Sequence, residues 1–244
     1  MTFSRPMGRK PSPFDARDYK LTRFMPTGFG KLSLVDEMMW EFPLSSPLDQ
    51  ELTNHCVGFS GANWGINLPI QDDYDNQTGH DFYYECKVID GEPENEDGSY
   101  VRSIAQVLRQ NSRIEAYAFA NSMESIKWWL LNRGPLTVGT VWTDDMFIVK
   151  PDGTLDISGN VSGGHAYVLN GYRKDDYIRI QNSWGSGWGD NGQAWISSVN
   201  FEQIFRYGGE AMTAVELPLG GVDAPVTGNG CIMGLLEKLW DIAT

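Results

Sequence analysis

Cysteine is scarce in this chain of 244 residues, which holds only Cys56, Cys86 and Cys231. Secreted scaffolds held by disulfides carry more cysteines in shorter chains, so this count excludes such a scaffold and favours a reducing compartment. We expect Cys86 and Cys231 to be free thiols, and a bridge between them stays open. The cysteines also lack the spacing of zinc ligands, and we expect no metal and no cofactor.

Positive charge is in short supply as well. The chain has 19 Lys and Arg residues against 32 Asp and Glu residues, which gives a net charge of −13. Such a body repels phosphate groups, so nucleic acids and anionic membranes are not expected as partners. A cleft in it would accept basic or neutral peptides better than acidic ones.

A long apolar run is missing from the first residues, 1–14, which hold three prolines and three basic residues. A signal peptide or a transmembrane helix needs such a run, so we expect a cytoplasmic protein, or one in a host cytoplasm or virion if it is viral. Residues 1–13 are predicted to form a basic flexible arm, ordered only if it lies on the body.

What is present is enough apolar sequence, 41% of the chain, to build a substantial core. The patterns predict helices at residues 56–67, 79–88, 101–111 and 122–133. After Pro135 they predict short strands of an antiparallel sheet at 136–142, 165–172, 177–184 and 192–197. We therefore predict an α+β domain over 14–217, with a helical lobe at about 50–133, a β lobe at about 134–217, and the site in the cleft between them.

Two further segments have simpler interpretations. The acidic loop at 91–98 is predicted to be a solvated connection. Residues 218–244 are predicted to be a tail that ends in an amphipathic helix. Its apolar stripe would dock on its own domain or, as the alternative, bind a protein partner.

Cys56 lies in a setting that suits a nucleophilic thiol. It follows a polar turn at 50–55 and begins a predicted helix, whose dipole and free backbone N–H groups favour a thiolate and a lowered pKa. Gln50 carries a carboxamide that can donate an N–H to the oxyanion formed on an attacked carbonyl.

Such a thiol needs a base, and the chain has three histidines. His55 is the neighbour of Cys56 and would point about 100° away from it on a helix start. His80 lies in a polar stretch that suggests a surface position. His165 follows two glycines and opens an apolar strand that would hold the ring rigidly, so it is the favoured base.

Asn182 strengthens that choice because it ends the strand after the one that His165 opens. One hairpin would bring its side-chain oxygen to the imidazole N–H and fix the tautomer. Trp184 and Trp188 would shield this hydrogen bond from water, or they are core anchors.

These segments resemble the active-site segments of the papain-like cysteine peptidases. The resemblance rests on Gln50, on Cys56 followed by GFS, on GGHAYVLNGY at 163–172 and on NSWGSGWGDNG at 182–192, and it extends over residues 14–216. It implies a papain-like two-lobed fold with Cys56 as nucleophile, His165 as general base and acid, Asn182 as its orienting residue, and Gln50 with the Cys56 N–H as oxyanion hole.

Departures from the family pattern are also visible. Val57 stands where an aromatic residue usually follows the nucleophile, and Thr53 stands where the family has a cysteine. No long inhibitory prosegment precedes Cys56, which favours a compact bacterial or viral type. Control of activity is then expected from a partner, the compartment or the basic arm, if there is control at all.

The leading hypothesis is a cysteine peptidase that hydrolyses peptide bonds through an acyl-thioester intermediate. Two alternatives stay open: a structural or binding component of a larger assembly on the same fold, and a thiol acyltransferase.

Overall fold

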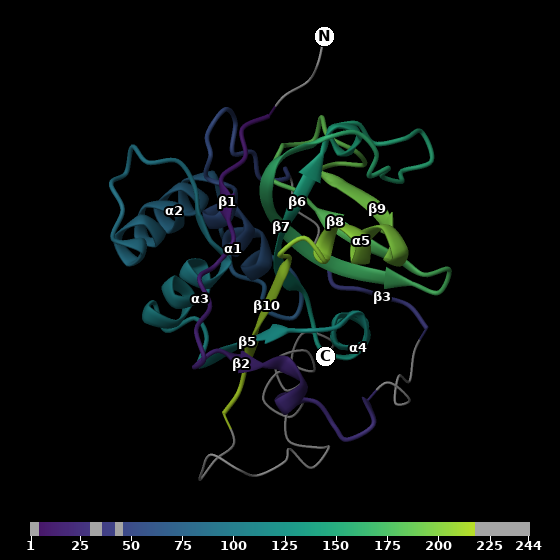
Figure 1. Cartoon of the computed structure of the whole chain (residues 1–244), viewed down its shortest axis with the longest axis horizontal. Helices are drawn as coiled ribbons and strands as arrows, with labels where there is room; N and C mark the ends of the chain where they lie inside the picture. Colours follow the sequence, from purple (N-terminus) through teal and green to yellow (C-terminus); the bar gives the residue numbers. More distant parts are fainter. Residues whose placement is uncertain (1–4, 30–35, 42–45, 218–244) are drawn as a thin grey trace, which may run out of the picture.

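The structure, a computed structural model, describes residues 5–29, 36–41 and 46–217. Figure 1 shows helices α1, α2 and α3 gathered on one side and most of the sheet with α5 on the other, while the purple strand β1 runs between them. Cys231 and the predicted helix of the tail lie outside the described residues.

The helical side consists of α1 (Cys56–Ile66), α2 (Asn76–Asp90) and α3 (Val101–Gln110). Every residue of α1 is buried, because α2 and α3 pack against it on one side and strands of the sheet on the other. Gly58 allows the close crossing with α2, since a Cβ atom there would lie 2.3 Å from the carbonyl oxygen of Gly79.

The sheet carries the other half of the molecule. Its strand order is β2, β5, β10, β6, β7, β8, β9, with β3 paired to β7 at the side, and all its pairs are antiparallel except β2 with β5. Two further strands, β1 and β4, form a separate parallel pair. The bounds are β1 (Arg9–Lys10), β2 (Tyr19–Lys20), β3 (Met38–Met39), β4 (Ser99–Tyr100), β5 (Ala116–Ala120), β6 (Leu136–Thr143), β7 (Val161–Arg173), β8 (Tyr177–Gln181), β9 (Gln193–Ser197) and β10 (Glu210–Val215).

The described residues also form the helices η1 (Leu21–Phe24), α4 (Met123–Asn132), η3 (Asp144–Phe147) and α5 (Ser198–Phe205). Ser122 caps α4, which lies within the predicted helix at 122–133, because its hydroxyl accepts the backbone N–H of Ser125. In the part of the chain that the structure describes, no helix has the length and apolar character needed to cross a membrane.

Two apolar cores lie on either side of the sheet. One packs α1, α2 and α3 against the sheet, and the other lies on the opposite side with α4 and α5. Strand β5 and helix α4, which the sequence analysis assigned to the helical lobe, thus belong to the sheet and its second core. Strand β5 pairs with β10, far along the chain, and such a pairing leaves no local signal in the sequence.

Candidate active site

Cys56 is the first residue of α1 and is fully buried. Its Sγ accepts a hydrogen bond from the backbone N–H of Gly8 at 3.3 Å, and the backbone of Ala166 in β7 also acts to lower the pKa of this thiol. Burial nevertheless raises the pKa of this thiol to about 11. The sequence predicts a lowered pKa from the helix start, and this is wrong for the described state because desolvation outweighs the dipole and the donors.

His165 and Asn182 are brought together as predicted. Nε2 of His165 lies 2.8 Å from Oδ1 of Asn182, and the same oxygen accepts the backbone N–H of Ser183 at 2.8 Å. The bond from the Ser183 N–H identifies this atom of Asn182 as the amide oxygen, and an amide oxygen can only accept hydrogen bonds. The imidazole must therefore donate, so Nε2 carries the proton in the neutral ring. The Nδ1 atom of His165 then holds a free lone pair, and it has no hydrogen-bond partner among the described residues.

Aromatic rings enclose this histidine. The Trp184 ring lies 4.7 Å from the His165 ring and the Trp142 ring 4.8 Å from it, measured between centroids. Trp188 packs on Trp184 at 5.8 Å. Burial among these rings lowers the pKa of His165 to about 4, although the bond to Asn182 opposes the shift. Both expectations for the tryptophans hold, because the rings that shield the histidine also belong to a core.

Gln50 is buried next to the same place. Its backbone N–H donates to the carbonyl oxygen of Ser183 at 2.9 Å, which ties the Gln50 loop to the segment that carries Asn182. The side-chain Nε2 donates to the carbonyl oxygens of Thr53, at 2.7 Å, and Pro6, at 3.2 Å. Gln50, the predicted oxyanion donor, therefore donates a hydrogen bond to the Pro6 carbonyl oxygen of the N-terminal arm.

A buried polar network fixes α1 against the strands. Asn63 donates to Ser183 Oγ at 3.0 Å and accepts from Gln181 at 3.1 Å, and Gln181 in turn accepts from Asn67 at 2.5 Å and Asn170 at 3.1 Å. Buried amides in such a network are costly to leave unpaired, so the relative position of the helix and the strands is well determined.

The other histidines do not join the site, as the sequence analysis expects. Nδ1 of His55 lies 2.7 Å from Nδ1 of His80, and the His55 ring stacks on Tyr83 with centroids 3.9 Å apart. Burial and the neighbouring His80 lower the pKa of His55 to about 4.

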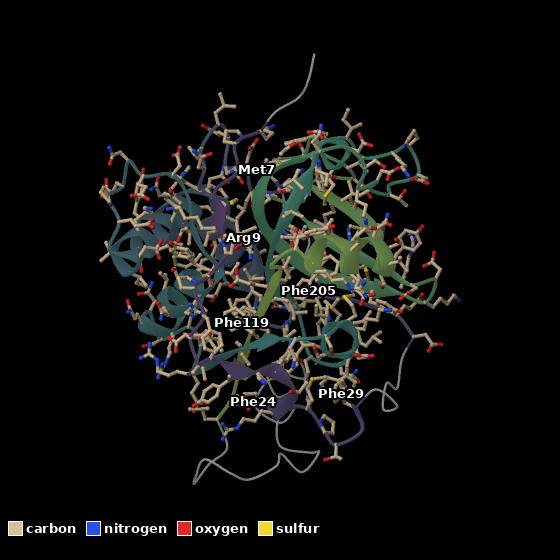
Figure 2. The ribbon with its side chains drawn as sticks, viewed as in Figure 1. Met7, Arg9, Phe24, Phe29, Phe119 and Phe205 are labelled. Atoms are coloured by element: carbon tan, nitrogen blue, oxygen red, sulfur yellow. The ribbon has the colours of Figure 1, made fainter. Side chains whose placement is uncertain are left out.

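Residues 5–10 of the arm lie on the body, the condition under which the sequence predicts that they are ordered, and they contact Cys56 directly, which the sequence does not indicate. Figure 2 shows Met7 and Arg9 on the segment of the arm that passes between the two halves. Arg5 bonds Asp49 at 3.2 Å near one end of the site. At the other end Lys10 bonds Glu92 at 2.8 Å and Glu96 at 3.2 Å, so the acidic loop at 91–98 holds the arm as well as connecting two elements. Only the opposite charges of arm and body could have suggested this contact.

Together these features define a class of protein: an α+β fold in which a buried thiol starts a helix that packs on the strand of a histidine oriented by an asparagine, and a buried carboxamide is tied to the segment of that asparagine. Residues 62–206, more than half of the chain, match the family described as papain family cysteine protease. The chain therefore belongs to the papain family. The matched segment includes His165 and Asn182 and begins after Gln50 and Cys56.

Two curated relatives carry cathepsin B-like names. Cathepsin B-like cysteine proteinase 6 of Caenorhabditis elegans is 31% identical over 80 residues, which are 32% of this chain and 21% of that protein. Cathepsin B-like cysteine proteinase 3 of Ostertagia ostertagi is 30% identical over 80 residues, 32% of this chain and 46% of that protein. The chain thus spans less than half the length of these relatives.

Solved structures agree on the fold. Xylellain, a cysteine protease from Xylella fastidiosa, superposes with a TM-score of 0.66 at 17% identity, over 88% of this chain and 100% of that one. Digestive procathepsin L 3 of the Tenebrio molitor larval midgut gives 0.56 at 17% identity, over 82% of this chain and 76% of that one. The predicted papain-like α+β fold is confirmed.

Proposed function

We propose that this protein is a cysteine peptidase that hydrolyses peptide bonds in peptide or protein substrates. The observation that carries the proposal is the 2.8 Å contact of His165 Nε2 with Asn182 Oδ1, which leaves Nδ1 as the basic atom on the strand facing Cys56. A base held in one tautomer near a buried thiol is the arrangement that nucleophilic thiol catalysis requires.

The steps follow from the positions of these groups. Nδ1 of His165 takes the proton of the Cys56 thiol, and the thiolate attacks the carbonyl carbon of the substrate. The oxyanion accepts N–H groups from Gln50 Nε2 and the Cys56 backbone. His165 then gives its proton to the leaving amine, and a thioester remains. Water, deprotonated by the same histidine, hydrolyses the thioester to a carboxylic acid and restores the thiol.

While the arm covers the site, this reaction does not proceed. Cys56 and His165 are both fully buried, and their shifted pKa values of about 11 and about 4 leave a neutral thiol beside a neutral imidazole at pH 7. The atom that faces Sγ is the amide nitrogen of Gly8, a donor, so this contact presents no carbonyl carbon for attack. A substrate must displace the arm before the reaction begins.

A thiol-directed epoxide and an unfolded protein substrate test the proposal. We expect the epoxide to label Cys56, and Cys56→Ala to abolish both labelling and cleavage. Cys86→Ala is the matched control, because Cys86 is also a buried free cysteine and contributes nothing to the site. Undiminished cleavage by purified Cys56→Ala contradicts the proposal, and amine incorporation without hydrolysis would identify an acyltransferase instead.

A further inference from the structure

The side chain of Arg9 fills a pocket next to the proposed nucleophile. It is 2% exposed, and the residue before it, Gly8, donates to Sγ of Cys56 at 3.3 Å. The backbone of Arg9 lies against the strand that carries His165, since a Cβ atom at Gly164 would be 2.2 Å from the Arg9 carbonyl oxygen. The pocket therefore opens onto the path that a bound chain follows, one residue away from the reacting sulfur.

A carboxylate lies at the end of this pocket. Oε2 of Glu210, the first residue of β10, accepts a hydrogen bond from Nη2 of Arg9 at 2.6 Å, and the carbonyl oxygen of Gly208 accepts from the same nitrogen at 2.5 Å. The Glu210 side chain is only 15% exposed. A guanidinium paired with a carboxylate in such a site is favoured, and an acidic or apolar side chain would leave the carboxylate unpaired.

The walls of the pocket suit a long side chain. A Cβ atom at Gly139 of β6 would lie 2.6 Å from Arg9 Nε and 2.8 Å from Cγ2 of Val101, so the absence of a side chain there leaves room for the arginine stem. Polar recognition is concentrated at the end of the pocket, because Arg9 Nε has no hydrogen-bond partner among the described residues.

Glu210 becomes available when the arm leaves. Its other neighbours are the backbone N–H of Ser12, itself part of the arm region, at 3.1 Å, and the charge of Arg102. Arg102 is bound to Asp18 at 2.5 Å. Within the described part of the chain, departure of Arg9 thus leaves Glu210 with no hydrogen-bonded cation.

We propose that Glu210 is a specificity-determining residue, and that its pocket selects substrates with a basic side chain, arginine above lysine. Arginine is preferred because its side chain is longer than that of lysine, and in Arg9 this length brings Nη2 to both the Glu210 carboxylate and the Gly208 carbonyl. Arg9 then competes with the basic side chain of a substrate for the Glu210 pocket. This inference rests on the proposed function, since it names the substrate class for the same site.

The test uses the full chain carrying Arg9→Ala, so that the pocket is free, with and without Glu210→Gln. Peptide sets vary three positions on either side of the cleaved bond among Arg, Lys, Leu and Glu. At one position we expect arginine to give the highest kcat/KM. Glu210→Gln should lower kcat/KM for that peptide about 10- to 100-fold, because a charge pair is lost, with little change for leucine. Glu202→Gln, which removes an exposed carboxylate on α5, is the matched control and should leave the preference unchanged.

A second variant keeps the inference testable if Glu210→Gln does not fold. Gly139→Ala places a methyl group where the arginine stem lies and should reduce the preference for arginine while leucine peptides are still cleaved. Epoxide labelling at Cys56 reports that each variant retains its site.

Two negative outcomes are distinguishable. If Cys56 is labelled and peptides are cleaved without preference for a basic residue, or with a preference that Glu210→Gln leaves intact, the inference is overturned and the proposed function stands. If neither labelling nor cleavage occurs in any variant, the proposed function fails, and the inference falls with it.

Discussion

At the scale of single residues, the hydrogen bonds of Asn182 and Gln50 determine what each side chain of the site can do in catalysis. Asn182 Oδ1 accepts from two donors, which determines the tautomer of His165 and leaves Nδ1 as the basic nitrogen. Gln50 Nε2 donates to the carbonyl oxygen of Pro6 in the arm. The oxyanion of the reaction forms from a carbonyl oxygen of the substrate, so the same N–H group could donate to it once the arm has left. Each of these side chains is held by backbone groups as well, so little reorganisation is needed when a substrate binds.

We expect Gln50→Ala to lower kcat about 10²- to 10³-fold, because one donor to the oxyanion is removed. The readout is kcat at saturating peptide, since loss of the Pro6 contact also loosens the arm and changes KM. Gln77→Ala, which removes an exposed carboxamide bonded to Asp81, is the matched control. An unchanged kcat in Gln50→Ala would exclude the oxyanion role.

At the scale of elements, the arm and the strands around it decide whether the site is open. Strand β1 pairs in parallel with β4, and ion pairs of Arg5, before this strand, and of Lys10, at its end, hold the arm to the two sides of the site. These two pairs are partly exposed, so each contributes modestly. The Arg9–Glu210 pair is more deeply buried, and a substrate that displaces the arm must replace it. The order of the arm follows from contacts with the body and not from its own composition.

Lys10→Ala should therefore raise kcat/KM about fivefold, as expected for losing about 1 kcal/mol of ion pairing that favours the covered state. Arg206→Ala, which removes an exposed ion pair with Glu202, should leave kcat/KM unchanged.

Lys10→Ala should also expose the Cys56 thiol. In the unaltered chain, alkylation of Cys56 by iodoacetamide should be slow from pH 5 to pH 9, because its pKa of about 11 keeps it protonated, and Lys10→Ala should accelerate it. Equal alkylation rates in both proteins would show that the arm does not protect the site.

At the scale of the whole molecule, burial of neutral histidines links stability to pH. Burial lowers the pKa values of His165 and His55 from 6.5 to about 4. Between these values the unfolded chain binds protons that the folded chain does not, so unfolding becomes more favourable as the pH falls. We expect the Tm to decrease from pH 6.5 to pH 4. A His55→Gln variant should show a shallower decrease, measured by thermal unfolding monitored by circular dichroism. A decrease as steep as that of the unaltered chain would assign the effect to other groups.

Local pattern was enough for most of the helical side and for the pairing of His165 with Asn182. Helices α1, α3 and α4 lie within a residue or two of their predicted bounds, since sequence periodicity and, for α4, the Ser122 cap act over a few positions. The histidine and the asparagine lie on neighbouring strands of one hairpin, so their meeting needs only a short stretch of chain. Strand β5 was not predicted from the sequence, because its partner β10 is distant along the chain.

The amino-acid sequence by itself determined the α+β class, the order of thiol, histidine and asparagine, and the acidic character of the body, because these depend on local spacing and composition. Only the tertiary structure decided the state of the site. Burial beneath the arm raises the pKa of Cys56 instead of lowering it, and the pocket shared by Arg9 and Glu210 joins opposite ends of the domain. Desolvation and long-range ion pairs depend on which surfaces meet, and that is settled only when the whole chain has folded.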